Sequence, residues 1–135
     1  MEQVFVDTAA WIALVNERDQ MRLRAREILQ QLLADRVLLF TTEFVLLELA
    51  DALSAPHLRA KTITFIEGLR QNARLEILPA STELLNEGWN LYCRRPDKEW
   101  GLTDCISFSV MTQRGLTRAF TSDHHFVQAG FEKLV

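Results

Sequence analysis

Short apolar runs that alternate with helix-like stretches constrain the fold of this chain most strongly. The strand-like runs are residues 3–6, 37–41, 75–78, 118–121 and 132–134. The helix-like stretches between them are residues 8–15, 22–34, 43–53, 58–72, 84–92 and 105–111. Each strand-like run is too short and too apolar to be half solvated, which favours a parallel sheet covered by helices on both faces. The sequence therefore predicts an α/β three-layer sandwich (α/β/α) with a mainly parallel central sheet.

Composition favours one globular domain over residues 1–135. The chain is 48% hydrophobic, enough for a sizeable core at this length, and no linker, repeat or low-complexity tract divides it. Asp7 interrupts the N-terminal apolar stretch, and no run approaches the ~18 apolar residues of a membrane span. We therefore expect a soluble, cytoplasmic protein. Cys93 and Cys105 are too few for a disulfide framework, and we expect both to be reduced and buried.

The charge balance limits the kind of nucleic-acid binding that the chain can support. Its formal net charge is -3, whereas sequence-independent affinity for a polyanion grows with the number of phosphates that Lys and Arg neutralise. Any contact with a nucleic acid must therefore be local or assisted by a metal ion.

Four carboxylates stand at or near the ends of apolar segments, where core packing gives no reason for an acid. Asp7 directly follows the first strand-like run, and Asp123 lies just past the fourth. Asp104 opens the last helix-like stretch, and Glu48 lies inside the stretch that follows the second strand-like run. Ligands of an open parallel sheet bind beyond the carboxyl ends of its strands. We therefore expect Asp7 and Asp123 to share one rim if their strands are neighbours, with Glu48 and Asp104 joining from helices.

Clustered carboxylates indicate a divalent metal ion. Four acids in one place repel one another, which raises some of their pKa values and destabilises the metal-free fold. Mg²⁺ or Mn²⁺ removes that conflict, because these ions prefer oxygen ligands and keep several waters. One or two such ions can orient a water for attack on a phosphodiester and stabilise charge on the attacking and leaving oxygens. The predicted chemistry is metal-dependent phosphodiester hydrolysis.

At these residues the chain resembles the PIN-domain family of ribonucleases, and especially its VapC-like branch, the toxins of bacterial toxin-antitoxin systems. The resemblance covers essentially the whole length and includes all four acids in the right order. Each matching motif is short, and together they are fairly specific. The motifs are Val6-Asp7-Thr8 with the apolar helix after it, residues 42–48 with their late glutamate, residues 102–108 and residues 120–126.

The resemblance implies a function, a cofactor and partners. The four acids would bind Mg²⁺ or Mn²⁺ and carry the hydrolysis of RNA. The hydroxyls of Thr8 and Ser122 would orient water or a carboxylate. Members of the family commonly form homodimers, and the toxin members pair with a small antitoxin protein that blocks the acidic pocket.

Other interpretations compete with a metal site. Asp7, Asp104 and Asp123 each suit a helix start, where free N–H groups and the helix dipole favour an anion, and Glu48 equally suits a solvated helix face. A haloacid dehalogenase phosphatase needs a second Asp where this chain has Ala9, and a dinucleotide-binding fold needs a glycine-rich turn that is absent here. The remaining rival is a non-catalytic PIN-like module that binds RNA or a protein and uses the acids only structurally.

Basic and aromatic residues near Asp104 are candidates for substrate binding. Arg94, Arg95 and Lys98 could hold phosphate there, although basic loop residues are most often only solvated. Trp100 lies in the same loop and is a candidate for base stacking, whereas the other two Trp residues suit a core or an interface better.

The adjacent pair His124-His125 looks like an imidazole metal motif. Side chains of adjacent residues in a turn usually diverge, so we do not expect this pair to bind a metal ion. Arg22, Arg24 and Arg26 could meet RNA, but alternate residues on a helix do not share a face.

Overall fold

The computed structural model describes residues 2–135. This part of the chain forms five strands and seven helices, with one or two helices between successive strands. In chain order they are β1 (Gln3–Val6), α1 (Thr8–Val15), α2 (Arg22–Ala34), β2 (Leu38–Thr42), α3 (Glu43–Ala52), α4 (Pro56–Arg70), β3 (Leu75–Leu78), α5 (Thr82–Arg94), α6 (Leu102–Arg114), β4 (Arg118–Phe120), α7 (His125–Gln128) and β5 (Glu132–Lys133). Across residues 2–135, every helix is too short or too polar to serve as a membrane span.

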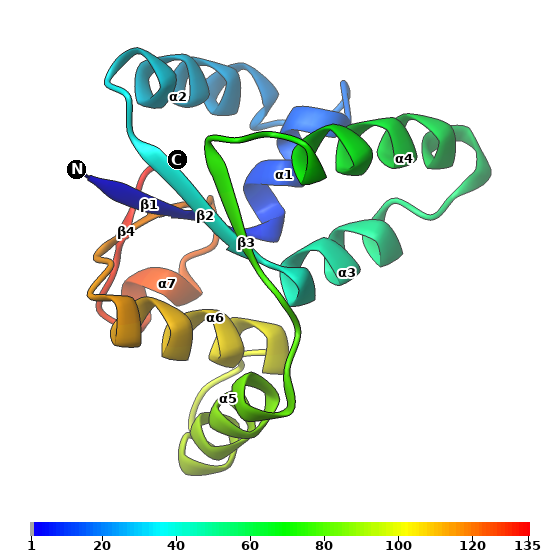
Figure 1. The fold of residues 1–135 in the computed structure, drawn as a ribbon. Coiled ribbons are helices and arrows are strands. Elements are labelled where there is room, and N and C mark those ends of the chain that lie inside the picture. Colours follow the sequence, from blue (N-terminus) through cyan, green and yellow to red (C-terminus); the bar gives the residue numbers. More distant parts are fainter. Residues whose placement is uncertain (1) are drawn as a thin grey trace.

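The strands form one parallel sheet in the order β3-β2-β1-β4-β5. The central strand is β1, where Phe5 is in register with Phe40 of β2 on one side and with Ala119 of β4 on the other. Helices α1, α2 and α4 lie on one face of the sheet, and α5, α6 and α7 lie on the other (Figure 1). The predicted α/β three-layer sandwich with a parallel sheet is confirmed.

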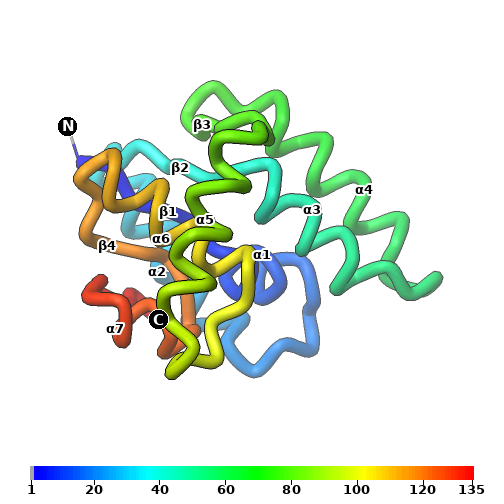
Figure 2. The backbone as a smooth tube through the Cα atoms, turned by 90° about the horizontal axis from the view of Figure 1, so that it is seen from below, coloured from blue at the N-terminus to red at the C-terminus, as the bar shows by residue number. Residues whose placement is uncertain are grey.

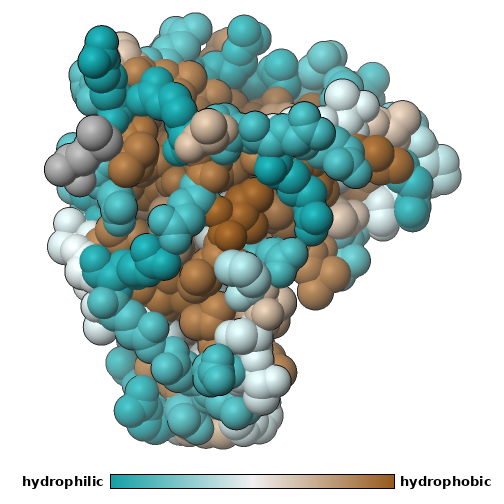
Figure 3. Space-filling model, viewed as in Figure 1, coloured by the Kyte–Doolittle hydropathy of each residue, from teal (hydrophilic) through white to brown (hydrophobic). Residues whose placement is uncertain are grey.

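The sequence of the central strands explains why both faces of the sheet are covered. Val4, Phe5 and Val6 are fully buried, although successive side chains of a strand point to opposite faces. Phe40 of β2 and Phe120 of β4 are buried beside them. Apolar surface crosses the middle of the molecule near the edge strand β3, between the more polar outer surfaces of the two helical layers (Figure 3). The core is therefore the sheet itself with the inner faces of the helices.

Helix α3 lies beyond the carboxyl ends of the strands and joins the two helical layers. It begins directly after β2, where the Thr42 hydroxyl accepts a hydrogen bond from the Val45 N–H (3.2 Å). It packs against α1 and α4 on one side and against α6 on the other. Its side chains therefore reach the rim of the sheet where the strand order reverses, between β1 and β4.

Three helices begin earlier than predicted, and each has a local reason. Helix α4 begins at Pro56, ahead of the predicted start at residue 58, because proline is well suited to the first turn of a helix. The Ser81 hydroxyl accepts a hydrogen bond from the Leu84 N–H (3.1 Å) and so starts α5. Helix α6 begins at Leu102, where the Asp104 carboxylate accepts a hydrogen bond from the N–H of the N-cap residue Gly101 (3.2 Å), and it ends where Gly115 adopts a φ of 67° that favours glycine.

Helices α5 and α6 pack side by side over the sheet (Figure 2). A Cβ atom on Gly88 would lie 2.9 Å from the Ile106 backbone, so this close approach requires glycine. Only one face of α5 packs against the protein, and its outer face is exposed to solvent. For this reason the prediction that both cysteines are buried is right for Cys105 and wrong for Cys93, which is exposed.

Candidate metal centre

Asp7 and Asp123 meet where the strand order reverses. The Asp7 N–H donates to the Phe120 carbonyl at the end of β4 (3.1 Å). The Thr121 hydroxyl donates to Asp7 Oδ2 (2.8 Å) and accepts a hydrogen bond from the Asp123 N–H (3.0 Å). The condition for a shared rim was that the two strands are neighbours, and β1 and β4 pair directly. One hydroxyl therefore links the two acids across the sheet.

Glu48 reaches the same rim from α3. The Thr8 hydroxyl at the start of α1 donates a hydrogen bond to Glu48 Oε1. Glu48 is half-buried, so its placement on a solvated helix face is not supported.

Asp104 enters from the first turn of α6. Its Oδ2 accepts a hydrogen bond from the Gly101 N–H (3.2 Å) and lies 3.3 Å from His125 Nδ1. The same ring nitrogen lies 3.4 Å from Asp123 Oδ1, which also accepts a hydrogen bond from the His125 N–H (2.9 Å). One imidazole therefore lies between the carboxylates of Asp104 and Asp123.

The four carboxylates lie within electrostatic range of one another. Burial raises the pKa of Asp7 to about 7 against the effect of the Thr121 hydrogen bond, and the charges of Asp104 and Glu48 raise it further. Burial also raises the pKa of Glu48, and the charges of Asp104 and Asp123 add to the effect. The pKa of Asp104 is raised by burial first and by the charge of Asp123 second. The pKa of each of these three acids is therefore raised in part by the charge of another acid of the set, and the four form one cluster.

Within residues 2–135, no Lys or Arg nitrogen lies within 4.0 Å of a carboxylate oxygen of the four acids, and only ring nitrogens of His124 and His125 do. Buried carboxylates without a counter-charge are costly, and a set of oxygen ligands of this kind suits Mg²⁺ or Mn²⁺. The residues present therefore fit a divalent cation.

Helix capping does not explain the cluster. Asp7 is the N-cap residue of α1, but its side chain makes no capping hydrogen bond and accepts one from Thr121 instead. Asp104 and Asp123 each accept one local backbone N–H, as helix-start residues do. Helix capping therefore does not explain the position of Asp7, and it explains only some of the contacts of Asp104 and Asp123.

Of the two hydroxyls that were expected near the acids, the structure places one beside a carboxylate and not the other. Thr8 contacts Glu48, so a hydroxyl does lie beside an acid at this position. Among the hydrogen bonds of residues 2–135 there is none from the Ser122 side chain, and the neighbouring Thr121 contacts both Asp7 and Asp123. The signal that could have identified Thr121 is its position as a polar, β-branched residue at the end of a strand-like run.

His124 and His125 do not diverge as expected. Their ring centroids are 4.5 Å apart, and one ligand atom from each lies with a carboxylate oxygen of Asp123 in a group within 4.8 Å of one another. The reason is that the chain folds back over Asp123 as it enters α7. The His125 side chain is 18% exposed and that of His124 is 72% exposed. His125 is therefore the more enclosed of the two, and His124 lies at the solvent-exposed edge of the cluster.

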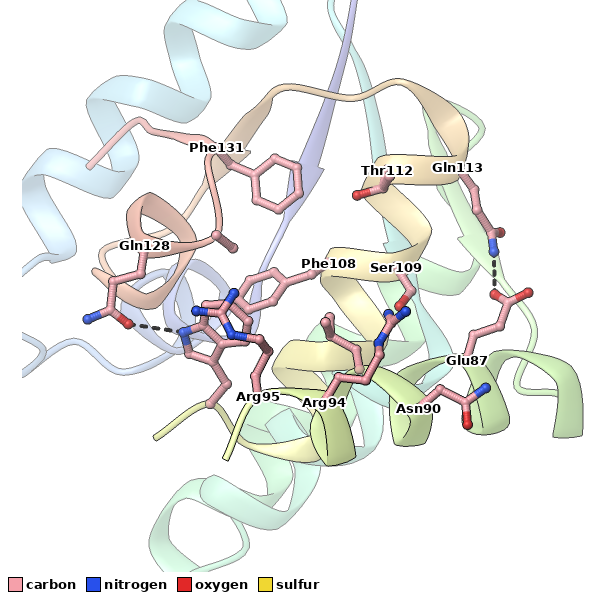
Figure 4. A pocket seen from close by; sticks show the side chains of 13 residues that line it. Glu87, Asn90, Arg94, Arg95, Phe108, Ser109, Thr112, Gln113, Gln128 and Phe131 are labelled. Carbon is pink, nitrogen blue, oxygen red and sulfur yellow. Dashed lines mark hydrogen bonds between the residues drawn. The ribbon is translucent and has the colours of Figure 1, made fainter. Parts of the chain in front are cut away.

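The basic loop between α5 and α6 borders a cavity of about 460 Å³ (Figure 4). Arg94 and Arg95 line this cavity. The Arg95 guanidinium lies 5.0 Å above the centre of the Trp100 ring, and it pairs with Asp97 (3.0 Å). Trp100 is only 6% exposed, and its indole donates to Gln128 Oε1 (3.0 Å). Trp100 therefore supports Arg95 and has little surface left for stacking on a base.

The PIN domain family profile matches residues 4–132. The chain belongs to the PIN-domain family. A curated relative is the 23S rRNA-specific endonuclease VapC20 of Mycobacterium tuberculosis (strain ATCC 25618 / H37Rv), 25% identical over 128 residues and 95% of each chain.

Solved structures show the same fold. The crystal structure of Mycobacterium tuberculosis VapC20, described as a sarcin-ricin loop cleaving toxin, matches with a TM-score of 0.82 at 26% identity, over 95% of each chain. DNA-bound VapBC from Salmonella typhimurium matches with a TM-score of 0.69 at 18% identity, over 98% of this chain and 97% of that one.

Proposed function

We propose that the protein is a metal-dependent endoribonuclease and the toxin of a toxin-antitoxin pair. The observation that carries this proposal is the cluster of four carboxylates, without Lys or Arg partners, where the sheet reverses its strand order. Membership of the PIN-domain family and similarity to VapC20 support it. A bound Mg²⁺ or Mn²⁺ would neutralise charge on the phosphate and lower the pKa of a water that attacks it. In this proposal the enzyme acts on RNA in the cytoplasm.

The four acids differ in burial, which divides their roles. Asp7 is the deepest at 3% exposed, and Thr121 fixes the orientation of its carboxylate. The Thr8 hydroxyl orients the Glu48 carboxylate in the same way. The side chains of Asp104 and Asp123 are 14% and 28% exposed, so they face the open side of the rim. An anionic phosphate can approach this surface only when the carboxylates hold a cation, which makes cleavage depend on the ion.

Purified protein stripped with EDTA should therefore cleave RNA only after Mg²⁺ or Mn²⁺ is added back. A 23S rRNA fragment that contains the sarcin-ricin loop is the first substrate to test, because VapC20 is named for that activity. The measurement is the appearance of discrete fragments on a denaturing gel. Cleavage that persists in EDTA would contradict the proposal, and RNA binding without cleavage would favour the non-catalytic PIN-like module.

We propose that the basic loop holds phosphates next to the cleaved bond. Arg94 and Arg95 line the cavity beside α6, and Lys98 lies 3.8 Å from Asp97. Arg94 forms no ion pair within residues 2–135, and Arg95 and Lys98 pair only with the exposed Asp97, which a phosphate would replace. Trp100 contributes by holding Arg95 in place. Such local contacts suit a chain whose net charge is -3.

The antitoxin fits the apolar groove between α1, α2 and α4. This groove has a volume of about 340 Å³. The Trp11 ring forms part of its wall. Arg22 and Arg26 also line the groove and favour an acidic amphipathic segment. The apolar lining includes Leu14, Leu29, Leu33, Phe65 and Leu69.

Leu33→Glu should weaken binding of the product of the neighbouring reading frame by at least about 10-fold, which is about 1.4 kcal/mol. Leu33 lines the groove and is 38% exposed, so a charge there repels an apolar occupant without unfolding the core. Leu23→Glu is the matched control, because Leu23 lies on the same helix, is 77% exposed and does not line the groove. Titration calorimetry measures both; similar affinities for the two variants would place the partner elsewhere.

We also propose a homodimer that forms through the outer face of α5. Leu85, Trp89 and Tyr92 are 40%, 53% and 43% exposed and recur at the spacing of one helix face. Light scattering at tens of micromolar should give about twice the chain mass of 15.6 kDa. Trp89→Glu should give the monomer mass, and Ile63→Glu, at a 56% exposed position of α4, should not. A wild-type monomer would contradict the dimer.

A further inference from the structure

The imidazole of His125 is the one nitrogen ligand that the described chain offers to the acidic cluster from a partly buried position. Its Nδ1 lies 3.3 Å from Asp104 Oδ2 and 3.4 Å from Asp123 Oδ1. The backbone N–H of His125 donates to the same Asp123 oxygen (2.9 Å), which fixes the residue relative to this carboxylate. The neighbouring His124 has a distance of 3.8 Å to Asp123 and a largely exposed side chain.

These distances fit shared coordination better than a hydrogen bond. An N–H···O hydrogen bond is usually about 2.9–3.0 Å long and nearly linear, and one ring N–H can be well aligned with only one of two carboxylates. Both distances here are longer, and they are nearly equal. Adjacent ligands of an octahedral cation with bonds of about 2.1–2.2 Å are separated by roughly 3 Å. The His125 nitrogen is therefore spaced from each of the two carboxylate oxygens as neighbouring ligands of one ion are.

We propose that His125 Nδ1 is a metal ligand alongside Asp104 and Asp123, and that it makes the site prefer Mn²⁺ to Mg²⁺. Mg²⁺ selects oxygen ligands, whereas imidazole suits later divalent ions of the first transition row. Four carboxylates alone would leave the choice between the two ions to charge and geometry. The inference rests on the metal site of the proposed function and adds the identity of one ligand and of the favoured ion.

The direct test is the electron spin echo spectrum of Mn²⁺ bound to the full-length, EDTA-stripped protein. A ligating imidazole produces nitrogen hyperfine coupling to the Mn²⁺ electron spin. We expect this coupling in wild type and in His57→Gln and His124→Gln, which remove the other two histidines. We expect it to be absent in His125→Gln. Wild-type protein that binds Mn²⁺ without nitrogen coupling would overturn the assignment of His125 while leaving the acidic site intact.

Metal titration gives a second measurement that is independent of activity. His125→Gln should weaken Mn²⁺ binding by about 10-fold or more and change Mg²⁺ binding by less than about 2-fold. Glutamine can still donate a hydrogen bond to Asp104, so equal losses for the two ions would assign His125 a positioning role and contradict ligation. If the wild-type protein binds neither ion, that result would contradict the metal site itself and, with it, the proposed nuclease activity.

Discussion

The Asp104→Asn variant should fold like the wild type and lose RNA cleavage by at least about 10²- to 10³-fold, the usual loss when one electrostatic group of an active site is removed. Asparagine keeps the size of the side chain, and its Oδ1 can still accept the Gly101 N–H that starts α6. It removes one negative charge from the centre of the cluster. Because Asp104 raises the pKa of both Asp7 and Glu48, it lies among the other acids, and its loss weakens the hold of the whole site on a cation.

Single-turnover cleavage rates in excess Mn²⁺ measure this effect, and circular dichroism shows whether the variant is folded. Asp51→Asn is the matched control, because Asp51 is an exposed acid on α3 one turn beyond Glu48. The control should cleave within about 2-fold of wild type, in keeping with the small effects of most surface substitutions. Equal rates for all three proteins would indicate a contaminating nuclease.

Without metal, the protein should become less stable as the pH rises from about 4 to about 7. The pKa of Asp7 is raised to about 7 in the fold, whereas an unfolded aspartate titrates near ~3.9. Between these values the folded state holds a proton that the unfolded state has lost, so the free energy of unfolding falls by up to about 1.4 kcal/mol per pH unit. The fall from this group ends above about pH 7. Glu48 and Asp104, whose pKa values are also raised, act in the same direction.

Asp7→Asn should remove much of this slope and stabilise the metal-free protein at pH 8, since an amide oxygen can still accept the Thr121 hydrogen bond. Mn²⁺ should stabilise wild type by about 2.7 kcal/mol at a concentration of 100 Kd and stabilise the variant less. Asp104→Asn and Asp123→Asn should follow the same pattern. Thermal melts from pH 5 to pH 8, with EDTA and with Mn²⁺, measure both effects. Independent helix caps predict the opposite sign, because removal of a cap destabilises a protein.

Local sequence patterns are sufficient to predict the layers of this fold and to select the candidate acids. Val4-Phe5-Val6 has no polar position, so a strand there must be covered on both faces, and an acid directly after it stands at the rim of the sheet. The pairing of β1 with β4 is different, because it joins segments from opposite ends of the chain and leaves no local trace. From sequence, the meeting of Asp7 and Asp123 could only be stated as a condition.

The details of the site depend on which way individual side chains point, and this could not be predicted from the sequence. Thr121 and Ser122 are adjacent hydroxyls, and side chains of an extended segment alternate between faces, so only the placed backbone decides which one meets Asp7. The same limit applies to His125, whose position between Asp104 and Asp123 follows from the turn into α7. The exposure of Cys93 could not be predicted either, because one face of α5 is left uncovered in the fold.

The hydrogen bonds through Thr121 have a consequence for how this protein is made. They join the first and the last acid of the cluster, so the site exists only after the segment at Asp123 has been synthesised and has paired beside the N-terminal strand. Translation that stops earlier, or proteolysis that removes β4, leaves fragments without a complete cluster. The proposed nuclease activity would therefore belong to the finished, folded chain alone, and a cell would have the whole time of synthesis and folding in which to provide the proposed antitoxin.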